Sequence, residues 1–185
     1  ARYRRVTSKG KTSYQLVFDR TPFYGNSGGQ IGDIGFIESA NERIPVVATE
    51  KENGLIIHIV NQLPENPAAE FTARVDPEKR QAAANNHTAT HLLDAALKQV
   101  LGEHVSQAGS LVTPEHLRFD FTHFEALSSE QLKAVEDLVN QQIFASKPVV
   151  TRVMGIDEAK AAGAVALFGE KYGDVVRVVS VGAED

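Results

Sequence analysis

The pattern of apolar residues changes from strand-like to helical at Asp76-Pro77, and no other feature of the chain constrains its fold as strongly. Before this point, short apolar runs are separated by clusters of Gly, Asn and Pro, which is typical of strands joined by tight turns. The predicted strands are residues 14–18, 44–49, 55–60 and 71–75. The dipeptide Asn53-Gly54 favours a two-residue hairpin between the middle pair. We therefore predict a small β-barrel-like domain over residues 1–75.

A helical pattern follows and opens a second predicted domain, residues 76–185. Asp is a good N-cap and Pro suits the first helical position, so a helix is expected over residues 77–101, with Gly102 as its stop. Further along, Ser128 and Gln131 form a capping-box pattern. The remaining predicted elements are strands at 117–121, 149–154 and 175–181, and helices at 128–146 and 157–162. This domain is predicted to be α+β, with helices packed on an antiparallel-rich sheet.

The composition excludes several classes of protein. No apolar run approaches the roughly 20 residues that a membrane-spanning helix needs, so no membrane location is expected. The chain has no Cys, which removes disulfides and thiolate metal ligands, and a cytoplasmic location fits this best. A formal net charge of −5 argues against indiscriminate binding of polyanions. A basic cluster within residues 2–11 is read either as a local RNA contact or as a solvated surface strand.

The most specific chemical feature is the run His87-Thr88-Ala89-Thr90-His91, inside the first predicted helix. A four-residue separation places two helical side chains on one side, one turn apart, so the two imidazoles can converge on one point. Neutral imidazole is a good ligand for Zn²⁺. Asp94 shares this face and would bind the ion or orient a histidine, or would pair with Lys98. From spacing alone, a metal site and a chance pair of histidines both stay open.

Several weaker signals accompany this motif. In Ser27-Gly28-Gly29-Gln30, adjacent glycines would let backbone amides face an oxygen of a ligand, or would form only a tight turn. The predicted loop at residues 105–110, which contains Gln107, either closes over a ligand or simply connects two elements. Residues 169–174 are predicted to form a turn. The side chains expected to be surface or structural histidines are His58, His104, His116 and His123.

Taken together and in this order, several motifs resemble the editing region of alanyl-tRNA synthetases. They are Thr21-Pro22-Phe23-Tyr24, Ser27-Gly28-Gly29-Gln30-Ile31-Gly32-Asp33, Asn86-His87-Thr88-Ala89-Thr90-His91-Leu92-Leu93, Val105-Ser106-Gln107, Arg118-Phe119-Asp120-Phe121 and Gly169-Glu170-Lys171-Tyr172-Gly173-Asp174. The similarity spans nearly the whole chain, and the helical motif is its most specific part. The resemblance implies a short barrel-like domain before an α+β editing domain, in agreement with the change at Asp76-Pro77.

The resemblance also implies a hydrolytic reaction. Members of the family remove serine or glycine from the tRNA for alanine, because an alanine pocket cannot strongly exclude these amino acids by binding alone. Their zinc ligands are the two helical histidines together with a Cys and a His from a downstream Cys-x-x-x-His motif. Carried over, the metal ligands are His87 and His91, Thr90 contacts the serine hydroxyl, and Gln107 positions substrate or water. The residues implied in substrate binding are Ser27, Gly28, Gly29 and Gln30.

This sequence departs from the family in ways that bear on the metal site. It contains no Cys-x-x-x-His motif, so Zn²⁺ is expected to be weak or absent in this piece, which we expect to be cut from a longer ATP-dependent alanine–tRNA ligase. Asp94 and Ala108 stand where bacterial members often have a His and a basic residue. The implied partner is tRNA(Ala) carrying Ser or Gly, and homo-oligomerisation of the parent stays open. The alternatives are a noncatalytic tRNA-binding module and a freestanding trans-editing deacylase.

Overall fold

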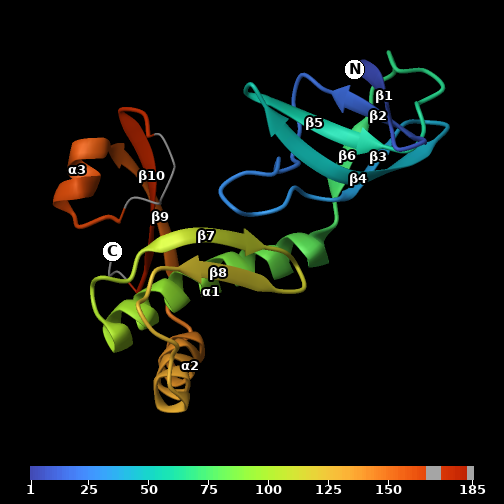
Figure 1. The fold of residues 1–185 in the computed structure, drawn as a ribbon. Helices are drawn as coiled ribbons and strands as arrows, with labels where there is room; N and C mark the ends of the chain where they lie inside the picture. The colour runs from blue at the N-terminus through green and yellow to red at the C-terminus, as the bar shows by residue number, and fades with distance from the viewer. Residues whose placement is uncertain (166–171, 183–185) are drawn as a thin grey trace. The chain divides into compact units, whose positions relative to one another are not determined.

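The computed structural model describes residues 1–165 and 172–182 (Figure 1). Contacts divide the chain into two compact units, of which the first is Ala1–Thr90 with Ser110–Arg118 and the second is His91–Gly109 with Phe119–Asp185. Helix α1, Pro77–Leu101, contributes residues to both. The predicted domain boundary between residues 75 and 76 falls at the beginning of α1, whereas the division by contacts falls within the helix. The domain boundaries therefore stay a prediction.

Six antiparallel strands form a sheet in the first unit, in the order β1-β2-β5-β4-β3-β6. Their bounds are β1 Arg2–Ser8, β2 Lys11–Val17, β3 Gly35–Glu38, β4 Arg43–Glu52, β5 Leu55–Val60 and β6 Thr72–Val75. The four predicted strands are confirmed as β2, β4, β5 and β6. The hairpin between β4 and β5 is also confirmed, because Asn53 and Gly54 both have positive φ, of 50° and 78°.

Apolar periodicity does not predict β1 or β3, although the interpretation of the basic segment as a solvated surface strand is confirmed for β1. β1 reads Arg-Tyr-Arg-Arg-Val-Thr-Ser and is exposed along most of its length, so no alternation of apolar and polar residues identifies it. A continuous ladder with β2, from Arg2 opposite Val17 to Ser8 opposite Lys11, defines this strand instead. β3 has four residues and lies between β4 and β6. Both strands follow from pairing with their neighbours and not from a local pattern.

The sheet is open within the described residues, because β1 and β6 form its two edges and no pairing joins them. The contact between β2 and β5 is short and involves Tyr14, Gln15 and Leu16 of β2. β4 carries an irregularity between Val46 and Ala48, which shifts its register with β5. The α+β class is thus confirmed, while a closed barrel is not found.

Apolar side chains of the sheet and of one loop form the core of the first unit. Its buried members are Leu16, Phe23, Ile37, Ile44, Val46 and Val60. In β4, Ile44 and Val46 are buried while their sequence neighbours are exposed, which is the two-residue period of a half-buried strand. Phe23 lies in the segment that leads into the glycine-containing turn. This segment is thereby anchored in the core.

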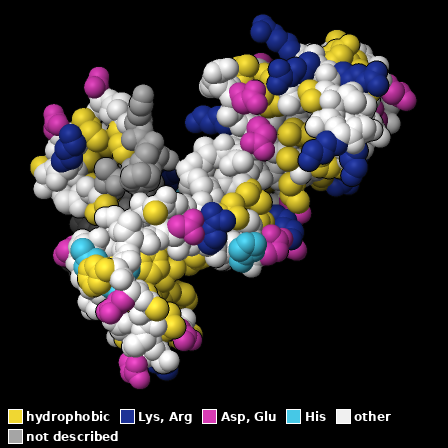
Figure 2. All heavy atoms as spheres, in the orientation of Figure 1, with side chains coloured by type: hydrophobic (Ala, Val, Ile, Leu, Met, Phe, Trp, Pro, Cys, Tyr) yellow, Lys and Arg dark blue, Asp and Glu magenta, His cyan; other side chains and the backbone are white. Residues whose placement is uncertain are grey.

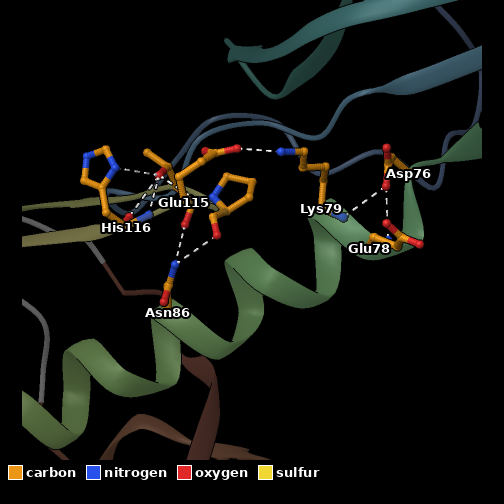
Figure 3. Close-up of polar contacts among 8 residues, drawn as sticks. Asp76, Glu78, Lys79, Asn86, Glu115 and His116 are labelled. Carbon is orange, nitrogen blue, oxygen red and sulfur yellow. Dashed lines mark hydrogen bonds and ion pairs between the residues drawn. The ribbon is translucent and has the colours of Figure 1, made fainter.

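Helix α1 begins and ends where the sequence predicts. The Oδ1 atom of Asp76 accepts hydrogen bonds from the backbone N–H groups of Glu78 and Lys79, at 3.1 and 3.0 Å (Figure 3). At the other end, Gly102 has a φ of 114° and its N–H donates to the carbonyl of Lys98. The histidine motif therefore lies in the middle of one continuous helix.

The second unit packs the last turns of α1 and helix α2, Ser129–Phe144, against strand β8, Leu117–Phe121. The buried residues of this core are Ala96, Leu97, Val105 and Val135, with Phe119 and Phe121 packed against them. The capping box of α2 is confirmed, since Ser128 and Gln131 exchange side-chain to backbone hydrogen bonds.

One loop prediction is wrong in part. Residues 107–110 belong to strand β7, Gln107–Val112, which pairs with β8. The first residues of β7 are Gln-Ala-Gly-Ser, which have low intrinsic preference for strands. The strand forms because its backbone finds partners on β8 and on the loop before β3, where the N–H of Val112 donates to the carbonyl of Gly29. Backbone pairing therefore outweighs the local preference.

The end of the described chain follows the prediction. Strand β9, Val149–Gly155, pairs antiparallel with β10, Val175–Val181, and helix α3, Ile156–Ala161, follows β9. These elements match the strands and short helix expected at 149–154, 157–162 and 175–181. Of the turn predicted at residues 169–174, the first three residues lie outside the described residues.

Candidate functional site

The predicted metal-ligating histidines both lie in α1, four residues apart, so helical geometry places them on one side of it. His87 is half-buried and belongs to the first unit, and His91 belongs to the second. Thr90 is 5% exposed, and its hydroxyl donates a hydrogen bond to the carbonyl of Asn86 at 2.8 Å. Because its proton is used in this way, the Thr90 hydroxyl can meet a ligand only as an acceptor.

The glycine-containing loop and the histidine motif meet in the first unit. The side-chain carbonyl Oε1 of Gln30 lies 2.7 Å from Nδ1 of His87, although the two residues are 57 positions apart in sequence. A carbonyl oxygen can only accept, so Nδ1 of His87 carries the proton and Nε2 carries the lone pair. Ligating histidines in metal sites usually donate their second ring N–H to such an acceptor. His87 therefore has the tautomer that coordination through Nε2 requires.

The loop that presents Gln30 is a tight turn. Gly28 and Gly29 have φ values of 57° and 78°, and the backbone groups of Ser27 and Gln30 exchange hydrogen bonds across them. A Cβ atom at Gly29 would overlap the hydroxyl of Ser110 on β7. Glycine is thus needed at residue 29 for its backbone conformation and for the close approach of β7. The interpretation of this run as a tight turn is confirmed, and substrate binding by Ser27, Gly28, Gly29 and Gln30 stays a prediction.

An ion pair holds the other end of this loop to α1. The guanidinium of Arg80 donates to both carboxylate oxygens of Asp33, with 2.7 Å between Nε and Oδ1, and also to the carbonyl of Pro22 at 2.9 Å. The Asp33 side chain is only 4% exposed and also accepts from the backbone N–H of Tyr24. The hydrogen bond to Asp33 raises the pKa of Arg80. No local pattern indicates this pair, because its members are 47 positions apart in sequence.

The turn between β7 and β8 is likewise attached to α1 in the first unit (Figure 3). The side-chain amide of Asn86 donates to the carbonyls of Thr113 and Pro114, at 2.8 and 3.3 Å. Near the beginning of the helix, Lys79 forms an exposed ion pair with Glu115 at 2.6 Å. Asn86 immediately precedes His87, so this attachment and the Gln30 contact act on adjacent residues of the helix.

In the second unit, His91 lies beside Asp94. By surface area His91 is exposed, yet the protein atoms around its imidazole lower its pKa, and the charge of Asp94 partly raises it again. The pKa responds to the environment of the ring and not to the exposure of the whole residue. A lowered pKa favours the neutral imidazole, which is the form that binds metals.

Asp94 forms the ion pair with Lys98 that was one of the predicted alternatives. Its Oδ2 atom pairs with Lys98 at 2.8 Å, one turn further along α1. Its Oδ1 atom is buried and has no hydrogen-bond partner within the described residues. Gln107, the first residue of β7, is half-buried in the same unit. Its predicted role in positioning substrate or water stays a prediction.

The donor set fits part of a zinc site. Among the described residues, no group of three or more His, Asp and Glu side chains is placed to hold a metal. The tautomer of His87 and the lowered pKa of His91 suit two imidazole ligands. Tetrahedral Zn²⁺ requires further ligands, and the chain has no Cys to supply one. Binding of Zn²⁺ by His87 and His91 therefore stays a prediction.

The other histidines have structural contacts. His58 is fully buried between Thr21 and the carbonyl of Leu16, and His116 lies near the hydroxyl of Thr113. His104 and His123 hydrogen-bond to each other at 2.8 Å, and both rings contact Phe124. Their expected role as surface or structural residues is consistent with these contacts. The pairing of His104 with His123 was missed, because 19 positions separate them.

The basic cluster near the beginning of the chain lies on β1 and at the turn into β2, and acidic residues lie among its side chains. Figure 2 shows Lys and Arg side chains interspersed with Asp and Glu over the first unit. Arg4 pairs with Glu52 at 3.6 Å. A groove of about 1030 Å³ beside β1 and β2 is lined by basic Arg2, Arg4 and Arg20 and by acidic Asp19, Glu52 and Glu70. This surface is therefore not a strongly positive patch.

Comparison with known proteins identifies the family. Residues 3–79 match the family described as tRNA synthetases class II (A). The alanine–tRNA ligase of Bacteroides fragilis is 57% identical over 183 residues, covering 98% of this chain and 21% of the relative. The alanine–tRNA ligases of Acetivibrio thermocellus and Pseudomonas fluorescens are 53% and 52% identical, over 92% and 91% of this chain and 20% of each relative. The chain belongs to the alanine–tRNA ligase family.

The chain spans about a fifth of the length of the curated relatives that it matches. Within the described residues, no helix is long and apolar enough to cross a membrane.

Proposed function

We propose that this chain is the editing region of an alanine–tRNA ligase and that it hydrolyses the ester between serine or glycine and tRNA(Ala). The proposal rests on the family and on one structural observation: the hydrogen bond between Nδ1 of His87 and Oε1 of Gln30 corresponds to the ring tautomer that coordination through Nε2 requires. The six-stranded unit corresponds to the barrel-like domain of the family, and α1 with the second unit corresponds to its editing domain. ATP-dependent attachment of alanine belongs to other parts of the longer ligases.

His87 and His91 are the residues that would hold Zn²⁺, together with a Cys and a His from further along the ligase. Zn²⁺ held there would supply positioning of the substrate and activation of a water molecule. Thr90 accepts a hydrogen bond from the hydroxyl of a serine substrate, because its own proton is donated to Asn86. Gln107 positions the substrate or the attacking water. The need for such a site is physical, since an alanine-binding pocket discriminates poorly against glycine and serine.

Two other functions are less well supported. A noncatalytic tRNA-binding module would need a positive surface, and the groove beside β1 and β2 is lined by as many acidic as basic side chains among its charged residues. A freestanding deacylase is disfavoured because the relatives that match 98% of this chain are ligases about five times as long. Binding of tRNA without hydrolysis by a longer protein would favour the first of these alternatives.

The test uses a chain extended past Asp185 until it includes a Cys-x-x-x-His motif. We expect this protein to contain zinc and to deacylate Ser-tRNA(Ala) and Gly-tRNA(Ala), and we expect His87→Ala and His91→Ala each to remove both properties. His116→Ala is the matched control, because His116 contacts only the turn residue Thr113 in the described contacts. An extended protein that binds no zinc and leaves both esters intact would refute the proposal.

A further inference from the structure

We infer that Gln30 is a positioning residue for His87: its side-chain carbonyl holds the proton on Nδ1, so that Nε2 is the nitrogen presented to a metal. The metal-binding purpose of this arrangement rests on the proposed function, whereas the hydrogen bond between Gln30 and His87 does not. It replaces direct substrate binding as the main role of Gln30. The observation that carries it is the 2.7 Å contact between Oε1 of Gln30 and Nδ1 of His87.

The position of Gln30 is fixed by its backbone. Its N–H and carbonyl bond to Ser27 at 3.0 and 3.1 Å across the two-glycine turn. On either side of it, the carbonyl of Gly29 accepts from Val112 at 2.8 Å and the N–H of Ile31 donates to the carbonyl of Val112 at 3.1 Å. The residue is only 7% exposed. A side chain held in this way loses little conformational entropy when it orients a neighbouring ring.

The position of His87 is fixed through its neighbour in the helix. The preceding residue, Asn86, is attached through its side-chain amide to Thr113 and Pro114 at the turn after β7. The same strand β7 carries Val112, which bonds to the loop of Gln30. β7 and the turn after it therefore hold both the loop of Gln30 and the helical residue next to His87. All of these residues lie in the first unit. The sequence separates these parts widely, and the fold brings them into one connected set.

The chemical consequence concerns the tautomer of the ring. An amide carbonyl that accepts from Nδ1–H stabilises this tautomer and makes the Nε2 lone pair more basic. An amide turned by 180° would instead place its N–H groups at Nδ1 and force the ring proton onto Nε2. A Gln30 that served only to contact substrate would have no influence on which nitrogen carries the proton. Measuring the tautomer of His87 therefore distinguishes a positioning role of Gln30 from a role in substrate binding only.

The primary experiment measures the tautomer by ¹⁵N and ¹³C NMR of the imidazole in the 185-residue chain at neutral pH, without metal. In the wild type, His87 is expected to carry its proton mainly on Nδ1. In Gln30→Leu the proton should move mainly to Nε2, whereas Gln30→Glu, which keeps an acceptor oxygen, should retain it on Nδ1. Gln99→Leu, on an exposed position of the same helix, is the matched control and should change nothing. The resonances of buried His58 report whether each variant is folded.

A second measurement links the tautomer to metal binding. In the extended chain, Gln30→Leu should weaken Zn²⁺ binding by roughly 10- to 100-fold, and Gln30→Glu should restore it. A wild-type His87 protonated on Nε2, or a tautomer unchanged by Gln30→Leu in a folded chain, would overturn the inference. The tautomer is measured without the deacylase assay. If the extended chain shows no deacylase activity, the proposed function fails, but the result on the tautomer of His87 is unaffected.

Discussion

At the scale of single residues, His58 shows how the first unit uses a neutral imidazole in its interior. The carbonyl of Leu16 can only accept, so Nδ1 of His58 carries the proton, and Nε2 accepts from the hydroxyl of Thr21 at 2.7 Å. The rings of Phe18 and Phe23 lie edge-on to the imidazole, with centroids 5.0 and 5.1 Å away. A protonated imidazole at this position would carry a desolvated positive charge. Its Nε2 would then donate the hydrogen bond to Thr21 instead of accepting it.

We predict that His58 makes the stability of the chain depend on pH. Burial lowers the pKa of His58 below its ordinary value of 6.5, and the bond to Leu16 only partly raises it. The unfolded chain therefore takes up a proton first, so the free energy of unfolding should decrease as the pH falls from 6.5 toward the folded pKa. His91 contributes in the same direction. Urea unfolding at pH 7.5 and 5.5 measures the change.

The comparison that isolates this residue is His58→Gln. The variant should lose about 1–3 kcal/mol of stability at pH 7.5, because buried hydrogen bonds are broken or weakened. Its further loss between pH 7.5 and 5.5 should be smaller than that of the wild type, since the contribution of His58 is removed and that of His91 remains. An equal pH dependence in the two proteins would show that His58 is not the responsible group.

Thr90 yields a prediction about selectivity. In the extended chain, Thr90→Val keeps the shape of the side chain but removes the acceptor proposed for the serine hydroxyl. Hydrolysis of Ser-tRNA(Ala) should fall by about three- to tenfold, as expected for one neutral hydrogen bond, while hydrolysis of Gly-tRNA(Ala) should change little. Thr88→Val is the matched control, because residues two apart on a helix do not share a face. Equal losses for both substrates would contradict the assignment.

What could be read from the sequence at this scale was the local part of the site. The four-residue spacing of His87 and His91 needs only the helix, and the helix was predictable from Asp76, Pro77 and Gly102. The partners of these histidines could not be read in the same way. The bond from His87 to Gln30 spans 57 positions and depends on where a loop and a strand lie in the folded chain.

At the scale of elements, the turn at Gly28-Gly29 and the turn at Asn53-Gly54 look alike in sequence but differ in their surroundings. Both contain a glycine with a φ of 78°, at Gly29 and at Gly54. An added Cβ at Gly54 meets nothing within 4 Å, whereas at Gly29 it overlaps Ser110 of β7. Only the first of the two turns is packed against another element at its glycine.

This difference predicts unequal effects of the same substitution. Gly54→Ala should cost about 1 kcal/mol or slightly more, because an L-residue is strained at this φ. Gly29→Ala has the same strain and must also move the Ser110 hydroxyl and crowd the Ser110 carbonyl on β7, so it should destabilise the chain more. The free energies of unfolding from urea titrations give the comparison. If both variants lose the same stability, the close approach of β7 to the turn is not a significant constraint.

Element prediction succeeded where a local pattern existed and failed where only pairing defined the element. β4 and β5 carry alternating apolar residues and a strong turn between them, and α2 carries a capping box. β1 is rich in Arg, and β7 begins with Gln-Ala-Gly-Ser. Such segments become strands because a neighbouring backbone offers hydrogen bonds, which is information that lies elsewhere in the chain.

At the scale of the whole molecule, the α+β class could be predicted from the change of pattern at Asp76-Pro77. The sequence did not indicate that the sheet stays open between β1 and β6. Whether β1 and β6 meet depends on the length of the β2–β5 contact and on the irregularity in β4, and neither is visible in hydrophobic periodicity. The composition also limits the metal site. A chain without Cys cannot supply a thiolate ligand, however well its two histidines are placed.

Zinc should therefore stabilise a longer chain and not this one. With two imidazoles alone, the 185-residue chain should show no significant change of melting temperature when Zn²⁺ is added. A chain extended to include the Cys-x-x-x-His motif should gain about 2.7 kcal/mol at a free zinc concentration 100 times its dissociation constant, because the metal binds the folded state. His87→Ala should abolish this gain in the extended chain. A similar gain in the 185-residue chain would mean that other side chains complete the coordination, and the downstream motif would then be unnecessary for binding.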